Sequence, residues 1–487
     1  MKYDPNILSE EYVLKDLETY KVPGMGVTIT KDGETILEAG FGVKDLETKE
    51  PITADTHWGI ASCSKAFTAT LLGMLQDQGK LGFDQPIREY IPEFDLVDKL
   101  AARDCTVRDM MLHRTGLSEH NALWTDPISR EELFRRLKYL APRSAFRKEK
   151  IYNNTVYTAL GYVCERVSGM AWEDMIRQWI FEPLGMTDSA TTLTDIAGFA
   201  DRATPYWNWR GDVKKLDDWS VYPGEPCAGV VSTMKDMTKW AKFHLADGLW
   251  DGKQLVSRET MEDMHALMIP TQTWAWDWPG LPAKGGYGCA WTGANYKGHQ
   301  VRFHTGEIEG YCTLTAFLPE DGITYVAFTN LHKPCPLPLF SCFYTALDHV
   351  LDLPATDWQG NFAAHIYDYE GANEDWDLDL FAGSVPVPGT APSHDLAAYA
   401  GTYTDPGYGP IEIVCEEEGL VMLYRGERHP LTHYHYDTFK LSRMKQDTLL
   451  ITMPVTFLAD PYTGAVDRAE IAIDPYTPPV AFKRGAK

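Results

Sequence analysis

The sequence lacks any uninterrupted apolar run of about 18 residues, the length that a membrane-spanning helix needs. Its first residues, MKYDPNILSEEYVLKD, are polar and acidic and do not include the apolar core of a secretory signal peptide. Basic residues are also few, since 45 Lys and Arg against 69 Asp and Glu give a formal net charge of −24. Such a charge repels nucleic-acid phosphates and anionic lipid surfaces. We therefore expect neither nucleic acid nor membrane as a partner, and we expect a cytoplasmic protein.

The cysteines do not have the spacing of a disulfide framework or of a structural zinc site. There are nine of them, an odd number, scattered from Cys63 to Cys415 without a C-x-x-C pair. Reduced thiols fit this pattern better than disulfides do, which agrees with a cytoplasmic location. No internal repeat is visible either, so solenoid architectures are excluded.

What the sequence has is enough apolar material for a large core: 44% of its 487 residues are hydrophobic and 12% are aromatic. This length predicts two domains or three. The pattern predicts a helix over residues 8–20, a β-hairpin over 22–45, and an apolar helix from Lys65 to Gly79. Residues 85–265 are mostly helical stretches broken by Pro and Gly. Strands return over 299–331, and a short apolar helix follows near 339–351.

These patterns predict a first domain over residues 1–353, in which strands from both ends form one sheet. Residues 354–392 are acidic and turn-rich, and they end in VPVPGTAPSH, which is typical of a linker. From residue 393 to 487, short strands recur at regular spacing, which predicts a small antiparallel β-barrel. The expected fold class is therefore α+β, an antiparallel sheet flanked by helices with a helical subdomain, followed by the barrel.

The first candidate for chemistry is Ser62-Cys63-Ser64-Lys65, where a strand-like segment enters the apolar helix. Ser62 and Lys65 would share one helix face. A helix N-terminus favours negative charge, so a serine there can become a nucleophile, and a lysine with a lowered pKa can relay its proton. An S-x-x-K tetrapeptide alone is a weak signal, because it recurs by chance in chains of this length.

Two further motifs follow in an informative order: Tyr152-Asn153-Asn154 before an apolar helix, and His304-Thr305-Gly306 on an expected strand. S-x-x-K, then Y-x-N, then [K/H]-x-G resembles the three-part pattern of the serine β-lactamase and penicillin-binding-protein superfamily. The segments MLHRTGL, EPCAGVVSTMKDMTKW, YGCAW and HTGEIEGY resemble its class C β-lactamase, D-aminopeptidase and esterase branch, the S12-like peptidases. The resemblance covers roughly residues 10–350.

The resemblance implies a role for each matching residue. Ser62 would be the acylated nucleophile, Lys65 its proton-relay partner, and Tyr152 the base and later the acid. Asn154 would orient the substrate, beside the strand that carries His304 and Gly306. The backbone N–H groups of Ser62 and Glu307 would hold the oxyanion. Taken singly, Tyr152 and Asn154 would be read as helix-capping residues.

One position departs from the family pattern, because penicillin-recognising members usually have lysine where this chain has His304. Glu307 and Glu309 add negative charge nearby. If both carboxylates face the cleft, they would repel an anionic β-lactam and attract an amine, so we expect amine-bearing or neutral substrates. The glutamates could equally point to solvent.

Several conspicuous residues have simpler interpretations. The trio Trp274, Trp276 and Trp278 could line an aromatic pocket, but packing of an irregular loop explains it as well. A histidine cluster over residues 429–435 has no carboxylate or thiol to complete a zinc site, so we expect neither metal nor cofactor. The remaining residues that we do not expect to carry chemistry are His57, His113 and the thiol of Cys63.

The C-terminal strands resemble the lipocalin-like barrel of some peptidases of this branch. Such a barrel could narrow access to the serine, or it could stabilise the protein or form a homo-oligomer. The sequence thus predicts a serine hydrolase that acts through a Ser62 acyl-enzyme on a small amide, peptide (including one with D-amino acids) or ester. An acyltransferase with a non-water acceptor and a non-catalytic pseudoenzyme that binds ligands or acts as a scaffold remain as alternatives.

Overall fold

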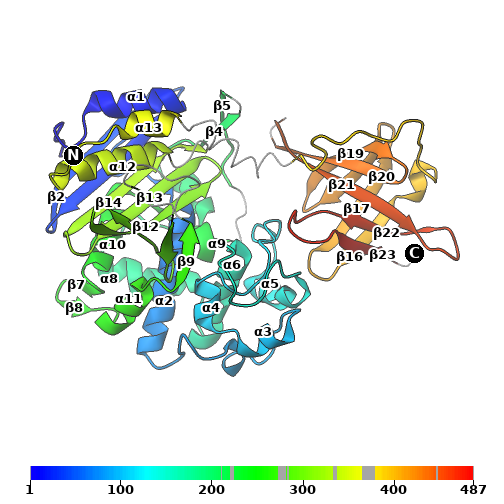
Figure 1. The fold of residues 1–487 in the computed structure, drawn as a ribbon, viewed down its shortest axis with the longest axis horizontal. Helices are drawn as coiled ribbons and strands as arrows, with labels where there is room; N and C mark the ends of the chain where they lie inside the picture. Colours follow the sequence, from blue (N-terminus) through cyan, green and yellow to red (C-terminus); the bar gives the residue numbers. More distant parts are fainter. Residues whose placement is uncertain are drawn as a thin grey trace.

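The computed structural model of the chain describes residues 2–209, 211–219, 224–272, 281, 284–332, 337–364, 379–445 and 448–485. A large unit of helices around a sheet is followed by a C-terminal barrel of strands (Figure 1). No helix within these ranges is long and apolar enough to cross a membrane.

An eight-stranded antiparallel sheet runs through the larger unit and is assembled from both of its ends. The predicted N-terminal hairpin turns at Asp32-Gly33, and its first strand pairs with a strand about 300 residues later, Met25 opposite Thr329. In spatial order the strands are β2 (Glu34–Gly42), β1 (Gly24–Lys31), β14 (Ile323–Thr329), β13 (Tyr311–Leu318), β12 (His299–Ile308), β11 (Thr292–Tyr296), β10 (Lys284–Tyr287) and β9 (Ile269–Gln272).

Helices cover both faces of this sheet (Figure 1). One face packs on α1 (Glu10–Tyr20), α12 (Leu337–Val350) and α13 (Trp358–Ala364) through a continuous apolar cluster. The other face packs on α2 (Ser64–Asp77) and α10 (Met234–Leu245), and this core continues into the helical subdomain. The α+β class is confirmed, and helix α2 is buried over most of its length, as its apolar composition predicted.

The subdomain between β2 and β12 is mainly helical, as expected. Its helices are α3 (Lys99–Asp104), α4 (Val107–Met111), α5 (Arg130–Arg136), α6 (Asn154–Ser168), α7 (Trp172–Met175), the π-helical turn η4 (Ile176–Phe181), α8 (Glu182–Leu184), α9 (Glu225–Ala228) and α11 (Arg258–His265). Short strands interrupt them, namely β3 (Trp58–Gly59), β4 (Tyr206–Trp209), β5 (Asp212–Lys215), β6 (Val231–Ser232), β7 (Leu249–Trp250) and β8 (Lys253–Gln254), with β15 (Leu331–His332) beside β4. Strands of two to four residues are too short to show a period of two.

Residues 354–392, expected as a linker, begin with an ordered helix. Helix α13 packs against α12, and its side chains Trp358 and Phe362 are fully buried. The Trp358 indole N–H donates to Asp348, which also accepts from Lys297. The sequence did not predict this helix, because the segment is acidic and turn-rich and Trp358 and Phe362 are the only strongly apolar side chains in the helix.

The C-terminal barrel is closed and has eight antiparallel strands, which confirms the predicted module. They are β16 (Gly401–Asp405), β17 (Gly409–Glu416), β18 (Gly419–Tyr424), β19 (Glu427–His435), β20 (Thr438–Lys445), β21 (Thr448–Ala459), β22 (Val466–Ile471) and β23 (Val480–Arg484). The sequence pattern did not predict β20 or β23, and it indicated β19 only as a half-buried strand around His433 and His435. Pro430 in β19 looks like a strand breaker although it pairs with Val421.

The cysteine expectation holds only in part. Within the described ranges seven cysteines are free, and six of these seven are buried. Cys312 on β13, however, is disulfide-bonded. The expectation of reduced thiols is therefore wrong for Cys312, and the cysteine pattern no longer supports a cytoplasmic location.

Candidate active site

Ser62 lies in a short 3₁₀ turn, Ala61–Cys63, that leads directly into α2. Ala61, the residue before it, has φ +48°, a left-handed conformation that is strained for a residue with a side chain. Strand β12 touches this turn at Gly306, where an added Cβ would lie 2.1 Å from the Ile60 carbonyl oxygen. Only glycine allows this approach, which brings the backbone of β12 next to the turn that contains Ser62.

Lys65 is fully buried one helical turn after Ser62. Its Nζ donates to Ser62 Oγ at 3.0 Å, to Asn154 Oδ1 at 2.7 Å and to the Cys227 carbonyl at 3.0 Å. These three acceptors match the three protons of an ammonium group. Burial lowers the pKa of Lys65 to about 8, so the group can lose a proton near neutral pH and then accept one from Ser62.

The segment that contains α9 holds the start of α2 from the other side. Besides the Cys227 carbonyl on Lys65, the Val230 N–H donates to Ser64 Oγ at 3.0 Å, and Thr68 Oγ1 donates to the Pro226 carbonyl at 2.7 Å. The segment EPCAGVV was part of the family resemblance, but its role as a backbone cradle for Lys65 was not predicted. A carbonyl contact carries no side-chain signature, so sequence reasoning had no signal for it.

Tyr152 and Asn154 lie at the N-terminus of α6. Asn153, not Asn154, is the N-cap: its side chain accepts from the Val156 N–H at 2.9 Å. Asn154 is thereby free to turn its Oδ1 to Lys65. The ring centroid of Tyr152 lies 4.8 Å from Lys65 Nζ. Burial raises the pKa of Tyr152 and a hydrogen bond with the Ser62 side chain opposes that shift, so the phenol stays protonated.

A chain of buried side chains runs behind Tyr152 to His304. The Asn153 N–H donates to His113 Nδ1 at 3.0 Å, which leaves the proton of His113 on Nε2, 3.4 Å from the Tyr287 hydroxyl. At the other end His304 Nδ1 donates to the Thr305 carbonyl at 2.6 Å, so its Nε2 accepts from the Tyr287 hydroxyl at 3.2 Å. Every donor in this chain has an acceptor when both histidines are neutral.

Burial agrees with these neutral histidines, because it lowers the pKa of His304 to about 3 and that of His113 well below its usual range. His304 therefore does not replace the cation of a lysine at this position. His113, which we expected to be structural, supports the backbone of Asn153 directly after Tyr152.

The outer half of β12 is open on the side of Ser62. Strand β11 pairs only with residues 299–303, whereas β13 pairs with residues 302–308. Ile308 pairs with Tyr311 across a two-residue turn, so both hydrogen bonds of that pair form, and the pair Glu307–Cys312 is a non-hydrogen-bonded one. The Glu307 N–H consequently points away from β13, toward the open side of the strand.

The carboxylate of Glu307 has a partner of its own. Its Oε1 lies 3.6 Å from Nε2 of His332, a buried histidine that stacks on Trp207. A cation that the motifs did not reveal lies closer to the tyrosine: Nζ of Lys150 is 5.2 Å from the ring centroid of Tyr152 and 4.5 Å from that of Tyr287. Burial lowers the pKa of Lys150 to about 8.

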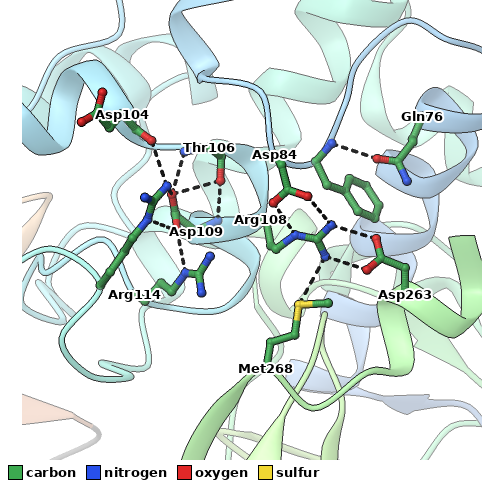
Figure 2. A network of polar contacts seen from close by, with 11 residues as sticks. Gln76, Asp84, Asp104, Thr106, Arg108, Asp109, Arg114, Asp263 and Met268 are labelled. Atoms are coloured by element: carbon green, nitrogen blue, oxygen red, sulfur yellow. Dashed lines mark hydrogen bonds and ion pairs between the residues drawn. The ribbon is translucent and has the colours of Figure 1, made fainter.

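Helix α4 carries two charged clusters, and one of them reaches the segment before Tyr152 (Figure 2). The Arg108 guanidinium makes bidentate contacts with Asp84 and with Asp263. Buried Asp109 accepts from Arg114, next to His113, and from Arg147, five residues before Tyr152. Burial alone would raise the pKa of Asp109, but its hydrogen bonds with Arg147 and Thr106 hold it below its usual range.

Other residues weighed from the sequence lie apart from this cluster or have structural partners. The Cys63 thiol is buried and donates to the His304 carbonyl at 3.3 Å, and burial raises its pKa to about 12. His57 stacks on Phe199. Trp274, Trp276 and Trp278 lie outside the described residues, and in that part of the chain which the structure does describe, no group of three or more His, Cys, Asp or Glu side chains could hold a metal ion.

Comparison with known proteins identifies the family of the chain. Residues 10–338 match the family described as Beta-lactamase, which is well over half of the chain. The chain belongs to this family of serine hydrolases. Residues 385–483 separately match a domain of unknown function, DUF3471, which corresponds to the barrel.

Relatives of this family member include a hydrolase and an aminopeptidase. The chain is 24% identical over 435 residues to unguisins hydrolase ungD′ of Aspergillus campestris, covering 84% of this chain and 77% of that protein. It is 31% identical over 256 residues to a D-aminopeptidase of Brucella anthropi, covering 50% of this chain and 46% of that protein. An octameric penicillin-binding protein homologue from Pyrococcus abyssi has the same fold, with TM-score 0.60, 20% identity, and coverage of 97% of this chain and 99% of that one.

Proposed function

We propose that this protein is a serine hydrolase that forms an acyl-enzyme on Ser62 with a small amide, peptide or ester. The contact that carries the proposal is the 3.0 Å hydrogen bond between Lys65 Nζ and Ser62 Oγ, with a lysine whose pKa burial lowers to about 8. A lysine of ordinary pKa would hold its proton too firmly to act as a base near neutral pH.

In the proposed reaction, Ser62 Oγ attacks the substrate carbonyl carbon while its proton passes to the neutral amine of Lys65. The backbone N–H groups of Ser62 and Glu307 stabilise the oxyanion. Because burial raises its pKa, Tyr152 keeps its proton at neutral pH and cannot accept the one from Ser62. We assign it the transfer of its proton to the leaving group, while the proton that Lys65 took from Ser62 passes to Tyr152 and restores the phenol. Water then attacks the acyl-enzyme by the same path in reverse. These roles need no metal or organic cofactor.

The charge of the substrate is a further part of the proposal. Neutral His304 offers no cation to a carboxylate beside the scissile bond, which favours neutral or amine-bearing substrates. Lys150 is a cation close by, and its lowered pKa reduces its charge above pH 8. Kinetics with p-nitrophenyl acetate and mono-p-nitrophenyl succinate test this point. We expect kcat/KM for the succinate to be no higher than for the acetate. A succinate preference that disappears in Lys150→Met would instead assign carboxylate binding to Lys150.

The catalytic proposal is tested by stopped-flow release of p-nitrophenol from p-nitrophenyl acetate. The wild type should give a burst equal to the enzyme concentration, followed by slower turnover, and Ser62→Ala should give neither. A burst of equal size in Ser62→Ala would exclude Ser62 as the nucleophile. Repeating the reaction with an added amine measures whether the acyl group passes to water or to that acceptor.

The names of two relatives suggest the substrates to try first. The unguisins hydrolase motivates assays with unguisins, and the D-aminopeptidase motivates assays with D-amino-acid amides. The octameric neighbour motivates a measurement of the mass in solution.

A further inference from the structure

The barrel contributes a buried carboxylate to the larger unit, at a point close to the catalytic tyrosine. Asp474 follows β22 and is 3% exposed. Its Oδ1 accepts from Ser118 Oγ at 3.0 Å, and its Oδ2 accepts from the His120 N–H at 3.0 Å. Ser118 and His120 belong to the loop that continues from the His113 turn, and both are fully buried.

The same loop holds the start of α6 from its other side. The Ser118 carbonyl accepts from Asn153 Nδ2 at 2.6 Å, and the His120 carbonyl accepts from Thr155 Oγ1 at 3.2 Å. Asn153 lies between Tyr152 and Asn154 and caps their helix. Asp474 is thus two hydrogen bonds away from the residue that fixes the Tyr152–Asn154 turn.

The barrel also holds this loop in a strained conformation. His120 has φ +47°, which costs free energy for a residue with a side chain. Its Nε2 donates to the Ala141 carbonyl at 2.9 Å, so its Nδ1 accepts from the hydroxyl of Tyr408, a barrel residue, at 2.7 Å. Two barrel residues therefore contact His120: Asp474 accepts from its backbone N–H, and Tyr408 donates to its ring.

We propose that Asp474 is a positioning residue, through which the barrel holds the Tyr152–Asn154 turn in its catalytic geometry. This inference rests on the proposed hydrolase function and adds that the larger unit alone does not complete its active site. Other contacts also hold the barrel against the larger unit, such as the ion pair between Arg425 of the barrel and Asp126 at 3.0 Å.

The test compares Asp474→Asn with two matched carboxylate variants. In Asp474→Asn the amide nitrogen faces either the His120 N–H or the Tyr476 N–H. Whichever way the amide is turned, at least one of these two backbone groups therefore loses its acceptor. We expect kcat for p-nitrophenyl acetate to fall on the order of ten-fold with KM nearly unchanged. Asp126→Asn alters the interface without touching the 118–120 loop, and Asp460→Asn alters an exposed turn of the barrel. Both should keep kcat within about two-fold of the wild type.

Ser118→Ala supplies a double-mutant cycle. If Asp474 acts through Ser118 and the loop, the loss in the double variant should be smaller than the product of the two single losses. Fully multiplicative losses would mean that Asp474 acts elsewhere and would overturn the proposal.

A second measurement does not depend on activity. Hydrogen exchange of the backbone amides of residues 152–156 should be faster in Asp474→Asn than in the wild type, and unchanged in both control variants. Unchanged kcat and exchange in Asp474→Asn, or equal losses in Asp126→Asn, would overturn the proposal. If the wild type formed no acyl-enzyme, the hydrolase function would fail while the exchange experiment still decided whether Asp474 holds the turn.

Discussion

The two halves of the site, around Ser62 and around Tyr152, are held in different ways. The Ser62 half rests on its own unit: β12 contacts the turn at Gly306, and the Cys227 carbonyl holds Lys65. The Tyr152 half depends on loops. Arg147 in one of them donates to Asp109, and Ser118 in another donates to the barrel residue Asp474. In the proposed mechanism the half around Ser62 is therefore held within the larger unit, whereas the half around Tyr152 also depends on contacts from the barrel.

Lys65→Met should have the largest effect, because it removes the proposed base from the nucleophile half. We expect kcat/KM for p-nitrophenyl acetate to fall about 10³-fold, the size of a general-base contribution. The thermal midpoint should change little, since removing a buried charge offsets the loss of the donor to Asn154 and to the Cys227 carbonyl. An active Lys65→Met protein would show that Ser62 gives its proton to another group.

Gly306→Ala tests the contact between β12 and the nucleophile turn. The new Cβ would meet the Ile60 carbonyl, so the strand must move away and carry the Glu307 N–H with it. We expect a loss in kcat on the order of 10²-fold, comparable to losing an oxyanion donor. Gly198→Ala is the control, because an added Cβ there meets nothing within 4 Å. Equal activity of the two variants would contradict the assigned role of β12.

His113→Phe weakens the tyrosine half from inside the larger unit. The Asn153 N–H loses its acceptor, which costs about 1–3 kcal/mol of stability for a buried group. We expect kcat to fall about ten-fold with a smaller change in KM. His57→Phe is a matched control. His57 is also buried and stacked on an aromatic ring, but it does not belong to the hydrogen-bonded side chains between Asn153 and His304. If both variants lost the same activity, the effect would be one of general stability.

Lys150→Met should have the smallest effect and alter the pH profile more than the maximum rate. After burial, the positive charge of Lys150 is one of the causes that lower the pKa of Lys65. Without it the pKa of Lys65 rises above about 8, so the neutral amine forms at higher pH. The rising limb of kcat/KM should move upward by less than about one pH unit. Lys148→Met, which alters an exposed lysine two residues earlier, should leave the profile in place. A downward shift in Lys150→Met would contradict this electrostatic coupling.

The same contrast separates what the sequence could predict from what it could not. Ser62, Lys65, Tyr152 and Asn154 were found from their motifs, and the structure places the other three around the Lys65 ammonium group. Motifs can locate these residues because each step of the proposed chemistry requires a particular type of side chain. The roles assigned to them remain predictions until activity is measured.

The supporting residues were not predictable in the same way. His113 and Tyr287 lay in segments that resembled the family, but their hydrogen-bonded chain joins positions 174 residues apart in sequence. Lys150 has no motif of its own. Asp474 would be read from IAIDPY as a turn residue, a role it also has, because its Oδ1 accepts from the Tyr476 N–H. Contacts between distant segments follow from the fold and not from local pattern.

The most direct test of the central claim is the intact mass of the protein after brief exposure to p-nitrophenyl acetate, followed by acid quench and peptide mapping. The account predicts a single acetyl adduct, on Ser62, that is absent from Ser62→Ala and forms far more slowly in Lys65→Met. An adduct on another residue, or equal labelling of Ser62→Ala, would contradict it.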